Sequence, residues 1–383
     1  MALLGLSAAV AFGQPAADPK ENATKKPGLE AAVSRGAEVV LSLEEKGAPG
    51  EWPYEGVYRV GGQIPIGYRV GGTGICAMAL MIAPGFDQND AAKAAVQRAL
   101  AFTLKGLDHP LMSPTDYDAG YDVRGWGYTY GLAFMLKAKE RGLIPEADRE
   151  RVEKAIRWCI GALQRTEIPQ VGGWNYARPP GKDKVAPPSP FMTAPTLQAL
   201  FEAKKAGYEV DAAVVGRALD YLESARMPDG AVLYSGEAKS GKHDQVRDAV
   251  PGAVGRMLAT ESTLYLAGRG SLERVRAAVD AYIVHWDWLN KRRAQPRTHE
   301  PPYMIAPYYF YYAHYYAAFA VELLPDNERA EYRRKINDLL MATRHEDGSW
   351  NDRVFPRSAN YGTSMAVMAM LMPQADNPAG WSR

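Results

Sequence analysis

Two helices of opposite character are predicted within residues 327–372, NERAEYRRKINDLLMATRHEDGSWNDRVFPRSANYGTSMAVMAMLM. The first, residues 327–344, is charged on one face, which is typical of a helix exposed to solvent. The second, residues 363–372, is apolar on every side, which is typical of a helix buried on every side. In the turn between them, Gly348 ends the exposed helix and the Trp350 ring packs on the pair. The stretch therefore predicts an exposed helix followed by a buried one.

The same alternation recurs along the chain. Charged helices are predicted near residues 28–45, 90–105, 145–165, 211–225, 271–290 and 327–344. Apolar helices are predicted after Gly74 and near residues 128–141, 193–206, 251–267, 307–324 and 363–372. Six such pairs predict an all-α fold of two concentric rings, an (α/α)6 toroid, with little or no β-sheet. An open α-solenoid is the alternative, but it would need polar capping repeats, and the long connections before the apolar helices favour closure.

Glycine–aromatic turns repeat with a fixed period and support this architecture. Gly173 precedes Trp174, Gly230 precedes Tyr234, and Gly348 precedes Trp350. Gly230 follows Gly173 by 57 residues, and Gly348 follows Gly230 by 118 residues, about two further periods. A period of this size indicates stacked units of helix, turn and helix.

These turns resemble the repeats of the terpenoid cyclase and protein prenyltransferase superfamily, which includes the prenyltransferase and squalene oxidase repeat proteins. Asp347-Gly348-Ser349-Trp350, followed by the apolar helix from Tyr361, is similar to the Gln-Trp repeat of squalene cyclases. Gly172-Gly173-Trp174-Asn175-Tyr176, followed by the helix from Thr193, is similar to a second copy. The resemblance covers most of the chain. It implies a central, aromatic-lined cavity that holds an elongated, hydrophobic ligand.

The catalytic motifs of that superfamily are incomplete here. The acid motif of class II cyclases is Asp-x-Asp-Asp, whereas Asp116-Tyr117-Asp118-Ala119 lacks the final acid, although Asp122 follows. The Asp, Cys and His zinc ligands of protein prenyltransferases have no match that transfers. Cys76 precedes Ala-Met-Ala, which excludes the Cys-Gly-Glu-Gln of thioester domains. The resemblance therefore supports the fold more strongly than it supports a particular reaction.

Composition bounds the partners and the location. The 383 residues contain 45 Lys and Arg against 44 Asp and Glu, and this net charge of +1 argues against a nucleic-acid partner. The apolar start predicts a signal peptide over residues 1–13 and hence export, although its first residues lack Lys and Arg. A linker over residues 14–27 and one toroid domain over residues 28–383 follow. After the leader no apolar run reaches membrane-spanning length, so we expect no membrane-spanning segment.

Residues that carry chemistry gather in the connections before the apolar helices. Asp118 and Asp122 would supply a general acid, or else cap the next helix. His243, beside Asp244, and His299, beside Glu300, would act as proton relays, or else belong to polar loops. The predicted catalytic residues are Asp118, Asp122, His243 and His299.

Aromatic and arginine side chains in the same connections are candidates for ligand binding. Tyr308, Tyr312, Tyr315 and Phe319 share one helical face, which suits either a cavity wall or a core. Two arginines after Trp350 would grip an anionic group, or else pair with Asp352 and its neighbours. The predicted binding residues are Trp126, Trp174, Tyr303, Tyr308, Tyr312, Arg353 and Arg357.

Metal and cofactor motifs are missing from the sequence. Adjacent pairs such as His299-Glu300 do not converge on one ion, and no His-Glu-x-x-His or phosphate-binding glycine loop occurs. We therefore expect no metal and no cofactor. The two cysteines, Cys76 and Cys159, would pair only if the fold brings them together.

Three functions remain open. The first is a cyclase-like or prenyltransferase-like repeat protein that binds a hydrophobic ligand, with or without catalysis. The second is an exported glycan lyase or hydrolase on an (α/α)6 barrel, since its loops carry Asp, His and Arg together with aromatic rings. The third is a binding scaffold without catalysis, and in all three the partner is a small molecule or a glycan.

Overall fold

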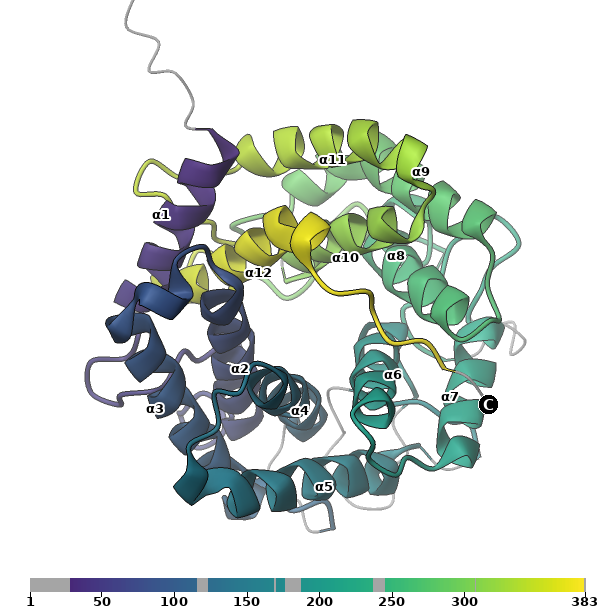
Figure 1. Ribbon diagram of the computed structural model, residues 1–383. Coiled ribbons are helices and arrows are strands. Elements are labelled where there is room, and N and C mark those ends of the chain that lie inside the picture. Colours follow the sequence, from purple (N-terminus) through teal and green to yellow (C-terminus); the bar gives the residue numbers. More distant parts are fainter. Residues whose placement is uncertain are drawn as a thin grey trace, which may run out of the picture.

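Twelve α-helices form two concentric rings in the computed structural model, which describes residues 28–115, 123–168, 170–175, 187–236, 245–306 and 308–381 (Figure 1). The outer ring contains α1 (Leu29–Ser42), α3 (Asp90–Leu107), α5 (Arg149–Thr166), α7 (Ala212–Ser224), α9 (Leu272–Asn290) and α11 (Asp326–Met341). The inner ring contains α2 (Ile66–Ile82), α4 (Arg124–Glu140), α6 (Pro190–Lys205), α8 (Val250–Leu266), α10 (Tyr309–Leu323) and α12 (Ala359–Leu371). The predicted leader and linker, residues 1–27, lie outside the described residues.

The ring is closed. Each inner helix packs against the next, and α12 returns to pack against both α1 and α2, so the open solenoid is excluded. Every residue of α12 is buried, whereas outer helices such as α11 bury one narrow face. Among the described residues, β-pairing is limited to three isolated bridges. The predicted (α/α)6 toroid is therefore confirmed.

Local signals explain where several helices begin and end. Asn89, Asp211 and Ser271 cap α3, α7 and α9, because each side chain accepts a hydrogen bond from a free N–H of the first turn. Gly142, Gly207 and Gly268 follow the C-terminal ends of α4, α6 and α8 at positive φ. These glycines make the turns from inner to outer helices short.

The start predicted for the second helix is wrong. Gly71, Gly72 and Gly74 lie inside α2, which begins at Ile66 and not after them. They permit close helix packing, since a Cβ at Gly71 would lie 2.6 Å from the Trp126 ring and one at Gly74 2.6 Å from the Tyr130 carbonyl oxygen. The glycines therefore seat α2 against α4 and do not interrupt the helix.

The glycine–tryptophan turns join each outer helix to the inner helix that follows. Three tryptophans make the same two bonds: the backbone N–H donates to a threonine hydroxyl of the inner helix, and the indole N–H donates to a carbonyl of the outer helix. They are Trp52 (to Thr73 and Val40), Trp174 (to Thr193 and Leu163) and Trp350 (to Thr363 and Leu340), with distances of 2.7–3.0 Å. Trp52 is a copy of this turn that the sequence analysis missed.

Candidate functional site

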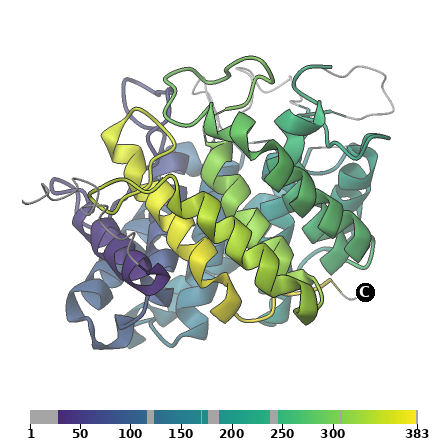
Figure 2. The same ribbon diagram turned by 90° about the horizontal axis from the view of Figure 1, so that it is seen from above.

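The two sides of the ring differ. On one side lie the long connections from outer to inner helices, such as residues 43–65 and 291–306; we call it the loop side (Figure 2). On the other lie the short connections and the C-terminal segment, residues 375–381, which crosses the ring (Figures 1 and 2). The sequence analysis placed the site on the loop side.

The loop side brings distant residues together around His299. The Nδ1 atom of His299 lies 2.8 Å from the Met304 carbonyl oxygen, and its Nε2 atom lies 3.4 Å from the Tyr234 hydroxyl. Burial lowers the pKa of His299, and the nearby charges of Arg247, Arg256 and Arg353 lower it further. Burial and these three arginines therefore favour the neutral form of the His299 imidazole.

Asp352, at the same side of the ring, is a titratable group that the sequence analysis considered only as an arginine partner. It is fully buried; its Oδ2 accepts a hydrogen bond from the Tyr54 hydroxyl at 3.2 Å, and its Oδ1 has no hydrogen-bond partner within the described ranges. Burial raises the pKa of Asp352 to about 7, and the Arg353 guanidinium offsets part of this rise. Arg353 is buried too, and its Nη1 donates to the Arg297 carbonyl oxygen.

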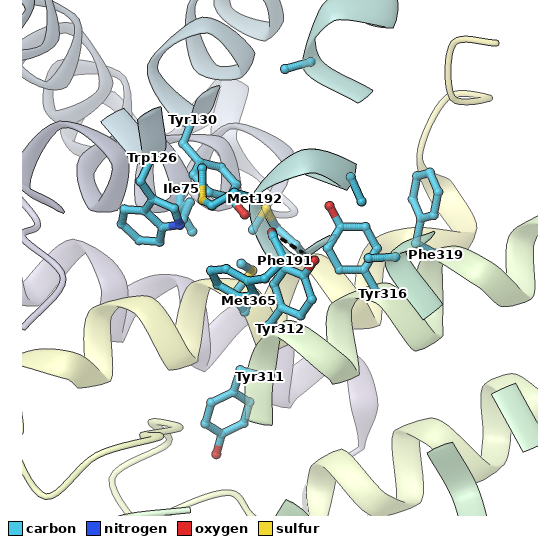
Figure 3. Close-up of a cluster of buried hydrophobic side chains, with 14 of the residues drawn as sticks. Ile75, Trp126, Tyr130, Phe191, Met192, Tyr311, Tyr312, Tyr316, Phe319 and Met365 are labelled. Atoms are coloured by element: carbon cyan, nitrogen blue, oxygen red, sulfur yellow. Dashed lines mark hydrogen bonds between the residues drawn. The ribbon is translucent and has the colours of Figure 1, made fainter. Parts of the chain in front are cut away.

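Three of the predicted aromatic binding residues are packed in the core. Trp126 lies among the rings of Tyr54, Tyr68, Tyr130 and Tyr361, and Tyr308 stacks on Tyr309 and contacts Phe191. The Tyr312 hydroxyl donates to the Phe191 carbonyl oxygen, drawn as a dashed line in Figure 3. That oxygen lacks its usual intrahelical donor, because Pro195 stands four residues later in α6 and has no N–H.

The other predicted binding residues hold the fold together. Trp174 is buried in its turn, and Tyr303 packs edge-on against Trp288 at 5.2 Å. Arg357 pairs with Glu45 and with Glu55, not with Asp352. The remaining predictions, Asp118, Asp122 and His243, lie outside the described residues.

A cavity of about 560 Å³ lies between the inner helices, and most of its lining comes from their middle and C-terminal parts. All six inner helices contribute to its wall. Its apolar and aromatic lining includes Met78, Ile82, Tyr130, Ala133, Leu136, Pro195, Ala199, Leu266, Tyr315, Tyr316, Phe319, Met368 and Met372. Figure 3 shows how Tyr130 and, on α10, Tyr316 and Phe319 lie within the neighbouring aromatic cluster.

The eight described residues of the predicted catalytic and binding sets do not line this cavity, whereas two of the other aromatic candidates, Tyr315 and Phe319, do. The prediction relied on the connections before the inner helices, whereas the cavity takes its side chains from the ends of those helices. One signal did exist, because Tyr315 and Phe319 share a helical face with Tyr308 and Tyr312 and both reach the cavity wall.

The charged groups of the cavity wall pair with one another. The Lys137 ammonium lies 2.7 Å from Glu140 and 3.0 Å from Asp376, and Lys205 lies 3.7 Å from Glu202. Hydrogen bonds to Glu140 and Asp376 raise the pKa of Lys137 against the opposing effect of burial. These acids of the cavity wall thus each pair with a lysine. Such pairs are typical of a charged rim around a cavity and not of an isolated general acid.

The C-terminal segment covers one side of the cavity, with Ala375–Ala379 in its lining. The backbone N–H of Ala379 donates to the Glu202 carboxylate at 2.7 Å, and the backbone N–H of Trp381 donates to the Leu266 carbonyl oxygen at 2.9 Å. The Trp381 ring lies 5.5 Å from the ring of Phe201, under the Lys204 ammonium at 3.9 Å. A few contacts therefore hold the segment over the cavity.

Replacing Trp381 by alanine should speed the entry of an apolar dye. The loss of the aromatic and cation–π contacts destabilises the conformation in which the C-terminal segment covers the cavity by about 1–2 kcal/mol. The fraction of molecules with an uncovered cavity then rises about 5- to 30-fold. Stopped-flow fluorescence measures the association rate. Trp288→Ala is the matched control, since Trp288 lies under Lys291 at 4.0 Å and beside Tyr303, away from the cavity wall. Equal rates in wild type and Trp381→Ala would mean that the segment does not limit entry.

Metal and thiol chemistry receive no support from the described residues. No group of three His, Cys, Asp or Glu side chains among them is arranged to hold a metal ion. Cys76 and Cys159 are both buried and unpaired, and burial raises the pKa of both thiols, to about 12 for Cys76. No helix in the described ranges is both long enough and apolar enough to cross a bilayer.

No family model matches the chain, and no curated protein sequence matches it. Solved structures do match. The unsaturated glucuronyl hydrolase of Bacillus sp. GL1 aligns with a TM-score of 0.58 and 11% identity over 90% of this chain and 96% of its own. An α-1,6-mannanase from Salegentibacter gives 0.55 and 10% over 90% and 99%. The type II terpene cyclase MstE from Scytonema gives 0.53 and 14% over 91% and 98%.

At such low identity these structures show the fold alone. They support the toroid architecture that the terpenoid cyclase superfamily shares, while membership in the repeat family stays a prediction. Their names span glycan hydrolysis and terpene cyclisation, so the fold does not select the chemistry.

Proposed function

We propose that this protein binds an elongated, mainly apolar small molecule in the cavity between its inner helices. The cavity itself carries the proposal. Its volume of about 560 Å³ falls within the range of small-molecule sites, and its wall is mostly apolar. Transfer of apolar ligand surface from water into such a space provides the binding energy.

A glycan-binding site on the loop side has weaker support. Glycan recognition needs polar side chains presented to a ligand, but two of the arginines described there, Arg256 and Arg353, donate to backbone carbonyl oxygens. Arg256 donates to the carbonyl oxygens of Val232, Gly252 and Arg247, and Arg353 donates to that of Arg297. The loop side therefore favours a structural role for these charges, and the proposal concerns binding with no catalytic step.

Filling the cavity tests the proposal. Ala133 is a half-buried residue of the cavity wall, so Ala133→Trp should weaken binding of the apolar dye N-phenyl-1-naphthylamine at least tenfold. Ala133→Leu should cause a smaller loss, because it occupies less of the space. Fluorescence titration measures both affinities, and circular dichroism checks that the variants are folded.

Ala277→Trp is the matched control, because Ala277 is exposed on the outer helix α9. It adds the same ring where no cavity exists and should leave dye binding unchanged. If wild type, Ala133→Trp and Ala277→Trp bound the dye equally, the dye would sit elsewhere and the proposal would fail.

A further inference from the structure

Two hydroxyl groups in the cavity wall lack protein partners. Tyr130 of α4 and Tyr315 of α10 both line the cavity. Among the described residues neither phenolic oxygen has a hydrogen-bond partner, and neither is one of the fully buried polar atoms left unpaired. Both oxygens therefore keep access to the cavity space, where a polar group without a partner costs free energy once water is displaced.

The neighbouring tyrosines differ in this respect. Tyr316 also lines the cavity, but its hydroxyl donates to the Gln198 side-chain oxygen at 3.3 Å. The Gln198 amide in turn donates to the Thr263 hydroxyl at 2.8 Å. The Tyr312 hydroxyl is used by the Phe191 carbonyl oxygen. Of the three tyrosines that line the cavity, Tyr130 and Tyr315 are thus the two whose hydroxyls have no partner among the described residues.

Both phenols keep their protons. Burial raises the pKa of Tyr315 to about 12, and burial raises that of Tyr130 further, with the nearby Tyr315 phenol adding to the rise. Each therefore offers an O–H donor across the physiological pH range. They lie on different helices of a mostly apolar wall, Tyr130 on α4 and Tyr315 on α10.

We propose that Tyr130 and Tyr315 select an apolar ligand that carries a neutral, hydrogen-bond-accepting oxygen, with a carbonyl as the best fit. A carbonyl oxygen has two lone pairs and can accept a hydrogen bond from either phenol or from both. The remainder of the ligand is hydrocarbon in contact with the apolar wall. This inference rests on the proposed function, since it names the class of ligand for the same cavity.

A pair of probes that differ in one oxygen tests the selection. Cyclododecanone carries the carbonyl, and cyclododecane is the matched hydrocarbon. Tyr130→Phe and Tyr315→Phe keep the ring and remove only the hydroxyl. Each should weaken binding of the ketone about three- to tenfold and leave binding of the hydrocarbon unchanged, as measured by displacement of the dye.

Tyr332→Phe is the control, because the Tyr332 hydroxyl donates to Asp280 on the outer ring, far from the cavity wall. It should change neither affinity. If both Phe variants bound the ketone as tightly as wild type does, the proposed selection of a carbonyl would be refuted. The proposal that the cavity binds an apolar molecule would be unaffected. If neither probe bound wild type, the cavity proposal and this inference would both be refuted.

Discussion

Replacing Trp174 by alanine is expected to lower the free energy of unfolding by about 3–5 kcal/mol. Trp174 is 1% exposed, and its ring fills the space between α5 and α6. The change leaves a cavity and also strands the Leu163 carbonyl oxygen, which accepts the indole N–H at 2.8 Å. Denaturant unfolding followed by circular dichroism measures the loss.

Two further variants separate the contributions. Trp174→Phe keeps most of the ring but not the N–H, so it should cost about 1–3 kcal/mol. Trp158→Ala should cost less than Trp174→Ala, because Trp158 is only partly buried. If Trp174→Ala kept its stability but lost affinity for the apolar dye, Trp174 would be a ligand-binding residue, as the sequence analysis proposed.

The ring architecture was predictable because burial determines how charged and apolar residues are distributed around each helix. Charges crowd one face of α11, whereas α12 is apolar on every side and buried along its whole length. The glycine–tryptophan turns added the period. These signals are local in sequence, so they can be recognised without knowledge of the tertiary contacts.

The glycines of α2 show where local signals mislead. Gly71 and Gly72 suggest a break in any helix considered alone, since glycine disfavours a helix interior. In the toroid they meet Trp126 and the backbone at Trp52, and a side chain at either position would collide with these groups. Packing against a neighbouring element overrides propensity here, and that neighbour is distant in the sequence.

The location of the cavity was not predictable for a related reason. A helix that is apolar on every side has no distinct face, so residues that touch another helix look the same as residues that line an empty space. Ala133 and Leu136 line the cavity, whereas Leu132 and Phe134 of the same helix are fully buried in the core. Only the geometry of the closed ring separates the two sets.

On the loop side, some of the described polar groups join distant connections of the ring. The Ser358 hydroxyl donates to the Glu55 carbonyl oxygen at 2.9 Å, and the Asn360 amide donates to that of Pro53 at 3.0 Å. These bonds join the first and last long connections of the ring. The polar side chains of these loops therefore contribute to ring closure. The sequence alone does not distinguish this structural role from a role in ligand binding.

Asp352→Asn is expected to stabilise the protein above pH 7 by up to about 4 kcal/mol and to have little effect below pH 4. An aspartate in the unfolded chain titrates near pH 3.9, whereas burial raises the pKa of Asp352 to about 7 in the fold. Between these values the unfolded state releases the proton and the folded state keeps it. The stability contributed by Asp352 is therefore complete below about pH 4, falls as the pH rises towards 7, and stays low above it.

Asparagine resembles the neutral acid in shape and does not ionise, so the difference between wild type and variant isolates this single titration. Chemical unfolding of both proteins between pH 4 and pH 8 measures it. Asp108→Asn is the control, since the Asp108 side chain is 77% exposed and should give a small difference at every pH. A difference between wild type and Asp352→Asn that did not change with pH would mean that Asp352 ionises equally in both states. The buried carboxyl would then have its charge fully compensated by Tyr54 and Arg353, contrary to the strong effect of burial.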